Sequence, residues 1–299
     1  MSRMIGRLSL LVLLLAACAP VDLNAPVPTF ETGISPETWA SIPAGEFLSG
    51  QFDTPAEIAY DYEMMVTDVT VEQYVAFLNS ALSAGVLQLG DGEITVFYPG
   101  DPFHGARHEI EIAAGHYVVV PTADPASRFT FDGQSFHALP GYEAHPMTNV
   151  SWFGALAYCD NYGWRLPTEM EWEKAARGAT GWPFPWGEEI ARNQANFQAS
   201  RDPFEDMRSF GSRTTPVGFY NGKTYAGYAT LDGASPYGLY DMAGNVWQWT
   251  GDIYEDMHLR FMRGGSKDCY EMDLRVWASN NAVPSYFGPG VGFRCARTP

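Results

Sequence analysis

Hydrophobic residues recur at helical spacing in three stretches of the chain, and each stretch follows a Ser or Thr that can cap a helix. The caps are Thr70, Ser151 and Thr168. Thr168 and Glu171 also match a capping box, in which each side chain bonds the other residue's backbone amide. Gly178 is a suitable end for the third helix. The apolar faces consist of Val71, Tyr74, Val75 and Leu78 in the first helix, Trp152, Ala155, Leu156 and Cys159 in the second, and Trp172, Ala175 and Ala176 in the third.

Residues 88–146 have a different pattern, because short runs rich in β-branched and aromatic residues are separated by Gly, Pro and Asp. The runs 94–98, 108–112 and 116–120 predict strands that are joined as hairpins. The run 42–47 predicts a strand with a turn. The chain after the third helix consists mostly of turns, aromatic residues and glycines. Three helices and many short strands predict an α+β fold.

Composition and charge exclude several classes of protein. The chain has 299 residues, of which 46% are hydrophobic and 18% charged, so it can bury a core and is not a disordered acidic chain. Its formal net charge is −17, which argues against binding to nucleic acid, because that requires a basic surface. Thirty glycines and an aromatic content of 14% favour a loop-rich fold packed by aromatic rings.

The N-terminal residues have the organisation of an export signal. Arg3 and Arg7 precede an apolar run over residues 8–17, and Cys18 follows. Such a run is too short to span a bilayer, whereas a basic start and a short apolar core are typical of a secretory signal peptide. Residues 15–18 (LAAC) resemble the bacterial lipoprotein box, which implies cleavage before Cys18 and lipidation of its thiol. An ordinary signal peptide with an incidental cysteine is the alternative.

We therefore expect three segments: a signal peptide over 1–17, a lipidated tether over 18–38 and a folded domain over 39–299. The tether is rich in proline, which favours an extended segment that does not pack. Removal of the signal takes away two positive charges and changes −17 to −19. Ala19 after the lipidated cysteine resembles the signal for sorting to the outer membrane of Gram-negative bacteria.

Eight short motifs occur in one order along the chain. They are 149–152 (NVSW), 165–169 (RLPTE), 184–187 (FPWG), 195–197 (ANF), 236–242 (PYGLYDM), 244–249 (GNVWQW), 263–266 (RGGS) and 292–294 (GFR). Together they resemble the formylglycine-generating enzyme family, also called the sulfatase-modifying-factor domain, over residues 42–297. The resemblance implies a fold related to C-type lectins, with little regular secondary structure. It also implies an oxidation that converts a sulfatase cysteine to formylglycine.

The family holds Cu(I) between two cysteines that are five positions apart. Soft thiolates select Cu(I), so two of them suit this ion. Cys269 matches the first position, but the second is Leu274, which has no metal-binding atom. Ser266 and Trp247 match residues that line the family's active site. Cys269 is therefore either a surviving reactive thiolate in a groove or a small buried cysteine without chemistry.

The resemblance also implies a disulfide and calcium. Cys159 and Cys295 match a disulfide pair of the family, which is plausible in an exported protein; two reduced thiols are the alternative. One calcium site of the family corresponds to Asp241, Gly244, Val246 and Gln248. The other begins at Asn196 and the Phe197 carbonyl, with its acidic partner near Ser209 or Asp206. Calcium prefers several oxygen ligands of which some are charged.

Two further groups of residues have an ordinary explanation. His104, His108 and His116 could suggest a metal site, but they fall among strand and turn signals, so we attribute their spacing to chance. Trp182, Phe184 and Trp186 could bind sugar rings, but aromatic residues in loop-rich proteins more often pack the core.

Two functions follow from these expectations. The first is a non-catalytic lipoprotein that binds a ligand or a protein, displayed through variable loops over 267–289. The second is an oxidase of the formylglycine-generating type that acts on a sulfatase or a related substrate through Cys269, Ser266 and Trp247. Leu274 at the second copper position favours the first.

Overall fold

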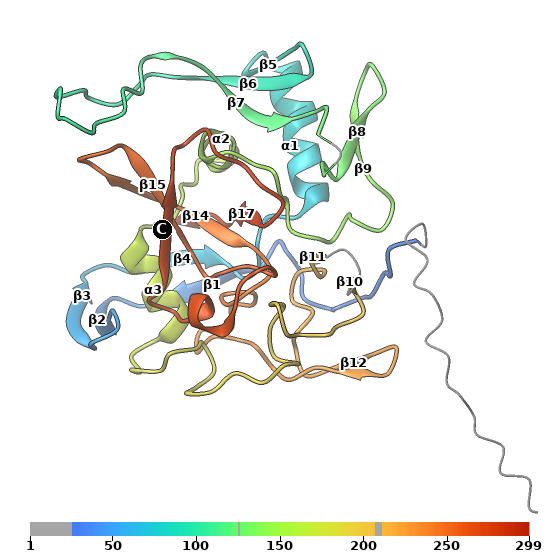
Figure 1. Cartoon of the computed structure of the whole chain (residues 1–299), viewed down its shortest axis with the longest axis vertical. Helices are drawn as coiled ribbons and strands as arrows, with labels where there is room; N and C mark the ends of the chain where they lie inside the picture. Colours follow the sequence, from blue (N-terminus) through green and yellow to red (C-terminus); the bar gives the residue numbers. More distant parts are fainter. Residues whose placement is uncertain (1–25, 125, 207–210, 299) are drawn as a thin grey trace, which may run out of the picture.

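The computed structural model describes residues 26–124, 126–206 and 211–298. Its regular elements are short and are connected by long turns (Figure 1). The helices are α1 (Val71–Ser83), α2 (Trp152–Asn161), α3 (Glu169–Arg177) and the 3-10 helix η1 (Glu271–Leu274). The strands are β1 (Trp39–Ile42), β2 (Gly45–Ser49), β3 (Thr54–Ile58), β4 (Tyr62–Met65), β5 (Leu87–Gly90), β6 (Glu93–Tyr98), β7 (Gly115–Pro121), β8 (Phe129–Phe131), β9 (Phe136–Ala138), β10 (Glu205–Asp206), β11 (Gly211–Ser212), β12 (Thr224–Tyr225), β13 (Tyr228–Ala229), β14 (Trp247–Tyr254), β15 (Leu259–Arg263), β16 (Ser279–Ala282), β17 (Val291–Phe293) and β18 (Ala296–Arg297).

The three predicted helices are confirmed. Thr70, Ser151 and Thr168 each accept a hydrogen bond from a backbone amide of the first turn, as the sequence predicts. Thr168 and Glu171 form the expected capping box, and α3 ends at Gly178. Each helix therefore begins at a residue whose side chain accepts a hydrogen bond from a first-turn amide that has no partner within the helix.

Two of the three predicted strands between residues 94 and 120 are confirmed as β6 and β7. Residues 108–112, all of which the structure describes, form a loop instead, so that prediction is wrong. The reason lies in Glu109, whose carboxylate accepts hydrogen bonds from the backbone amides of His104 and Ala106. The Glu109 carboxylate thus supplies the backbone amides of this turn with hydrogen-bond partners, which a neighbouring strand would otherwise have to supply.

The sheets are small and mostly antiparallel. A four-stranded sheet has the order β16-β15-β14-β17, in which only the β14–β17 pair is parallel; β5-β6-β7 and β1-β4-β18 are three-stranded. Helix α2 packs between the β5-β6-β7 sheet and the central strands, where the rings of Tyr117 and Phe153 stack at 4.1 Å. Helix α3 packs on a second core with β1 and β4. Many short elements thus share a few aromatic cores, which confirms an α+β fold with little regular structure.

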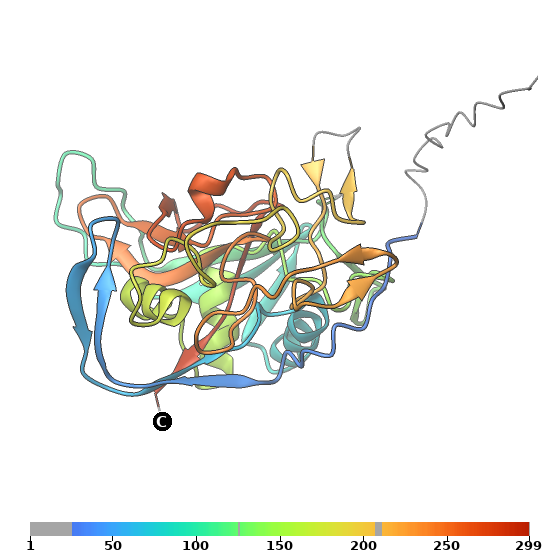
Figure 2. The same cartoon turned by 90° about the horizontal axis from the view of Figure 1, so that it is seen from below.

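The described part of the proline-rich segment lies along the domain (Figure 2). The Phe30 ring contacts Phe204, Phe219 and Tyr225, with ring centroids 5.4 to 5.8 Å apart. Asn221 also donates a hydrogen bond to the Thr32 carbonyl. The expectation that the segment stays unpacked up to residue 38 is therefore wrong, because its apolar side chains find an aromatic surface on the domain.

Candidate functional site

The candidate site begins at a tight turn after β15. Gly264 and Gly265 both have positive φ, which lets the chain reverse there. The backbone amide of Cys269 donates to the Ser266 carbonyl at 3.0 Å, and Ser266 Oγ lies 3.4 Å from Cys269 Sγ. The turn therefore brings the hydroxyl and the thiol into contact.

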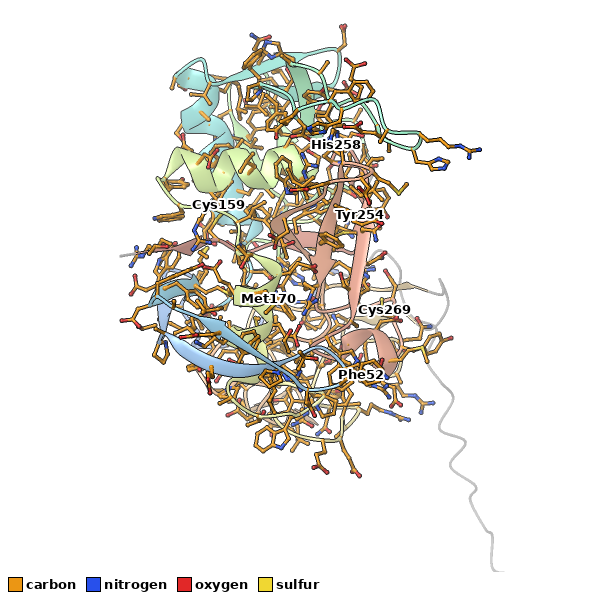
Figure 3. The ribbon with its side chains drawn as sticks, turned by 90° about the vertical axis from the view of Figure 1, so that its left-hand side faces the viewer. Phe52, Cys159, Met170, Tyr254, His258 and Cys269 are labelled. Atoms are coloured by element: carbon orange, nitrogen blue, oxygen red, sulfur yellow. A yellow bond between two sulfur atoms is a disulfide. The ribbon has the colours of Figure 1, made fainter. Side chains whose placement is uncertain are left out.

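Trp247, Ser266 and Cys269, which the sequence assigned to one site, do lie together. They line a pocket of about 410 Å³ beside β14, β15 and β16. The amide of Trp247 donates to the Gly290 carbonyl at 2.8 Å, which fixes the start of β14 against the loop that closes the pocket. Figure 3 shows Cys269 close to this part of the molecule's surface, and its side chain is half-buried. The remaining wall includes Asp268, Asn280, Asn281 and Tyr286.

Leu274 lies at the end of η1 and is fully buried. It belongs to a small apolar cluster with Phe184 and Phe197, against which Cys269 also packs. A Cβ atom on Gly265 would come within 2.9 Å of Leu274 Cδ1, so glycine is required for the turn to cover this leucine. Of the two copper positions, only Cys269 offers a sulfur atom. These residues therefore do not fit a two-thiolate Cu(I) site.

The calcium set around Gln248 is also unsuited to the ion. Gln248 Oε1 accepts hydrogen bonds from Trp172 Nε1 at 2.7 Å and from Arg294 Nε at 2.8 Å, and its Nε2 donates to the Asp241 carbonyl at 2.7 Å. The Asp241 carboxylate accepts from the Gly218 amide at 2.7 Å. Burial raises the pKa of Asp241 to about 6, although the Gly218 amide and the Arg294 charge oppose that rise. The Gln248 amide is therefore occupied by the Arg294 guanidinium, the Trp172 indole and a backbone carbonyl. Calcium would instead need several free oxygens, some of them charged, at this position.

The other calcium set has one donor without a partner. Asn196 is buried, and its Oδ1 has no hydrogen-bond partner among the described residues, while its Nδ2 donates to the Arg213 carbonyl at 2.9 Å. Gly244 packs so closely on this residue that a Cβ atom there would lie 2.3 Å from the Asn196 carbonyl oxygen. Ser209 lies outside the described residues. An orphaned carboxamide oxygen suits calcium, so Asn196 Oδ1 is free to serve as one of the several oxygen ligands that the ion needs.

The disulfide is confirmed. Cys159 of α2 and Cys295, between β17 and β18, are bonded with their Cα atoms 5.8 Å apart. Both side chains are fully buried. Cys18, the predicted lipidation site, lies outside the described residues. No described helix has both the length and the apolar character needed to cross a bilayer.

Two groups of candidate residues remain, the aromatic residues around Phe184 and the histidines around His104. The first group packs the core, and the second belongs to a cluster that the sequence did not predict. Phe184 is buried and stacks on Trp186 with ring centroids 5.9 Å apart, which fits a packing role. His104 has a different set of neighbours from the one its sequence spacing suggested, because its ring lies against Glu109, which also contacts His258. Sequence reasoning missed His258 because nothing local links it to residues almost 150 positions earlier.

Comparison with known proteins assigns the chain to a family. The model of the Sulfatase-modifying factor enzyme 1-like domain matches residues 25–299. Because this is nearly the whole chain, the protein belongs to the sulfatase-modifying-factor, or formylglycine-generating enzyme, family. The matched region begins before residue 39, in agreement with the packing of Phe30 on the domain.

Individual relatives carry different names. The chain is 38% identical over 177 residues to the serine/threonine-protein kinase pkn1 of Chlamydia caviae, covering 53% of this chain and 25% of the relative. It is 35% identical over 162 residues to the inactive C-alpha-formylglycine-generating enzyme 2 of Bos taurus, covering 50% of each. The chain thus spans half or less of these relatives. The solved structure of PvdO from Pseudomonas aeruginosa shares the fold, with a TM-score of 0.56 and 21% identity over 92% of this chain and 99% of PvdO.

Proposed function

We propose that this chain is an exported, lipid-anchored member of the family that binds a ligand or a protein partner and does not catalyse cysteine oxidation. The observation that carries the proposal is Leu274. The family's Cu(I) chemistry needs two thiolates, and here the second position is an apolar residue locked in the core. A relative from Bos taurus is named inactive C-alpha-formylglycine-generating enzyme 2, and this name supports a role without catalysis.

Leu274 is part of the core and does not line the pocket. Leu274 is 0% exposed and sits beneath the Gly265 turn, in the apolar cluster against which Cys269 also packs. The thiol of Cys269 is left with the Ser266 hydroxyl as its polar neighbour. Residue 274 therefore contributes packing and supplies no metal ligand.

The pocket that contains Cys269 remains suitable for binding. Its walls combine two aromatic side chains, Trp247 and Tyr286, with the polar groups of Ser266, Asn280 and Asn281. Pockets with an apolar platform and a few convergent polar groups are typical of ligand sites. The strand β16, which carries both asparagines, is an edge strand of its sheet, so a partner chain can approach it from solvent.

Anchoring is the second part of the proposal. It rests on the basic start, the apolar run over residues 8–17 and Cys18, which together predict an export signal with a lipidation site. Labelling of the full chain with a radioactive fatty acid tests this part. Incorporation that is lost in Cys18→Ala supports lipidation at Cys18, and equal labelling of both proteins contradicts it.

The catalytic part is tested by copper binding and by product formation. The purified chain is titrated anaerobically with Cu(I) against a coloured chelator, and its co-expression with a sulfatase peptide is followed by mass spectrometry of formylglycine. We expect no Cu(I) retention and no conversion. Conversion that disappears in Cys269→Ala would establish the oxidase instead.

Two substitutions at one position show whether Leu274 is the cause. Leu274→Cys restores a second sulfur, and Leu274→Ala makes a similar cavity without sulfur. We expect Leu274→Cys alone to retain Cu(I). If neither variant binds, or if both do, the identity of residue 274 does not decide copper binding and the argument fails.

We also propose one calcium ion at Asn196, with the Phe197 carbonyl as a neighbouring ligand. The partnerless Asn196 Oδ1 supports this. Thermal unfolding in calcium and in excess EGTA tests it. We expect EGTA to lower the melting temperature of the natural chain and to leave Asn196→Ala, which lacks the ligand, unchanged between the two conditions. An equal melting temperature of the natural chain in both conditions would exclude the site.

A further inference from the structure

Two loops that are distant in sequence meet at one edge of the molecule. The first is the long connection between β6 and β7, and the second is the turn between β14 and β15; both project to the same side in Figures 1 and 2. An ion pair joins their bases, because Arg260 donates to Asp101 at 2.6 Å and both side chains are buried. Figure 3 shows His258 where the hairpin meets the other loop.

Three potential metal ligands converge at this junction. His104 Nδ1 and His258 Nε2 each lie 3.2 Å from Glu109 Oε1, and all three atoms lie within 4.8 Å of one another. Two ligands of a tetrahedral Zn²⁺ ion, each about 2.0–2.1 Å from the metal, are separated by about 3.4 Å. The two nitrogen-to-oxygen distances are therefore already close to those of a coordination shell.

The ligands are held in position by a second set of hydrogen bonds. The carboxylate of Glu109 accepts from the backbone amides of His104 and Ala106, both at 2.8 Å. His258 Nδ1 lies 2.8 Å from the carbonyl oxygen of Ile110. A carbonyl oxygen only accepts, so Nδ1 carries the proton and the lone pair of neutral His258 lies on Nε2, the atom that faces Glu109. Metal-binding histidines are oriented by this type of bond.

Burial and charge also suit a metal ion. The side chains of His258 and Glu109 are 4% and 1% exposed, whereas that of His104 is 73% exposed. Two ligands of the site are thus buried and one is exposed to solvent. An ion can enter the site from the exposed side. One carboxylate and two neutral imidazoles partly balance a divalent cation, and imidazole nitrogen selects transition metals over calcium or magnesium.

We propose that His104, Glu109 and His258 form a binding site for a divalent transition metal of the zinc type. The ion joins the β6–β7 loop to the β14–β15 hairpin, and water completes its coordination. The site is separate from the pocket around Cys269 and does not depend on the proposed function.

The competing explanation is a simple ion pair. Without a metal, a doubly protonated His258 would bond Glu109 directly, and His104 would be an incidental surface neighbour. The two explanations differ in the role of His104, because an exposed histidine contributes little to a buried ion pair but supplies one of three ligands to a metal. They also differ in whether the protein binds metal at all.

The test uses the purified full chain after treatment with a chelator and dialysis. Titration calorimetry with ZnCl₂ measures binding, and the visible absorption of added Co²⁺ reports nitrogen ligands in tetrahedral geometry. We expect one equivalent of Zn²⁺, a Co²⁺ spectrum that Zn²⁺ abolishes, and no competition from excess Mg²⁺.

Three variants locate the site, two at proposed ligands and one as a control. His104→Ala removes an exposed ligand and is not expected to perturb folding, whereas His108→Ala removes an exposed histidine four positions away. We expect His104→Ala and Glu109→Gln to weaken Zn²⁺ binding by more than about tenfold and His108→Ala to leave it unchanged. The proposal is overturned if the natural chain binds neither Zn²⁺ nor Co²⁺, or if His104→Ala binds as tightly as the natural chain.

Discussion

The disulfide between Cys159 and Cys295 is expected to make a large contribution to stability. It spans 136 residues and joins α2 to the C-terminal strands, next to the point where the Met65 amide donates to the Cys295 carbonyl at 3.0 Å. A cross-link restricts the unfolded chain, and for a loop of this length the chain-entropy relation gives about 5 kcal/mol. This is an upper figure, because real unfolded chains are already compact.

The perturbation is the double substitution of Cys159 and Cys295 by alanine, which avoids leaving polar atoms in sites that are fully buried. We expect the free energy of unfolding to fall by about 2–5 kcal/mol. Urea unfolding followed by tryptophan fluorescence measures this change. Addition of a reductant to the natural chain should have a similar effect, and it should have none on the double variant.

Cys269→Ala is the matched control, because it removes the free thiol of the described part of the chain and leaves the cross-link intact. Its unfolding midpoint should stay close to that of the natural chain. If the double variant unfolds at the same urea concentration and with the same slope as Cys269→Ala, then the 136-residue loop does not limit the unfolded chain and the reasoning is refuted.

Three further predictions concern single side chains. Burial, followed by the charge of Arg128, lowers the pKa of His145 to about 3, so the folded protein binds fewer protons than the unfolded chain between pH 3 and 6.5. Stability should therefore fall as pH drops through this window, by up to about 1.4 kcal/mol per pH unit, and His145→Gln should flatten that slope in urea melts at several pH values; an unchanged slope would contradict this. Phe30→Ala should lower stability by about 1–3 kcal/mol and speed proteolysis of the N-terminal segment, because three ring contacts are lost, whereas identical digestion would show that the segment is not held there. Leu274→Ala should cost about 2–5 kcal/mol in thermal or urea unfolding, since the side chain is fully buried; a loss below about 1 kcal/mol would mean that the position is not a packing site.

Local signals in the sequence determined the three helices and the strands β6 and β7. Thr70, Ser151 and Thr168 satisfy backbone amides only a few positions away, so the start of each helix depends on neighbours in the chain. The ordered motifs identified the family, and through it the Cys159–Cys295 pair and the grouping of Trp247, Ser266 and Cys269. The missing copper ligand at Leu274 was also visible in the sequence alone.

Only the tertiary structure decided how distant groups are used. The apolar pattern cannot show that Leu274 packs under Gly265, or that the amide of Gln248 is occupied by Trp172 and Arg294, because these contacts join separate elements. The run around residue 110 alternates like a strand, yet the carboxylate of Glu109 folds it into a turn and brings it to His258. The sequence thus determined which local elements and which family chemistry are present. The fold decided which side chains meet, because burial and hydrogen bonding across the chain set the environment of each group.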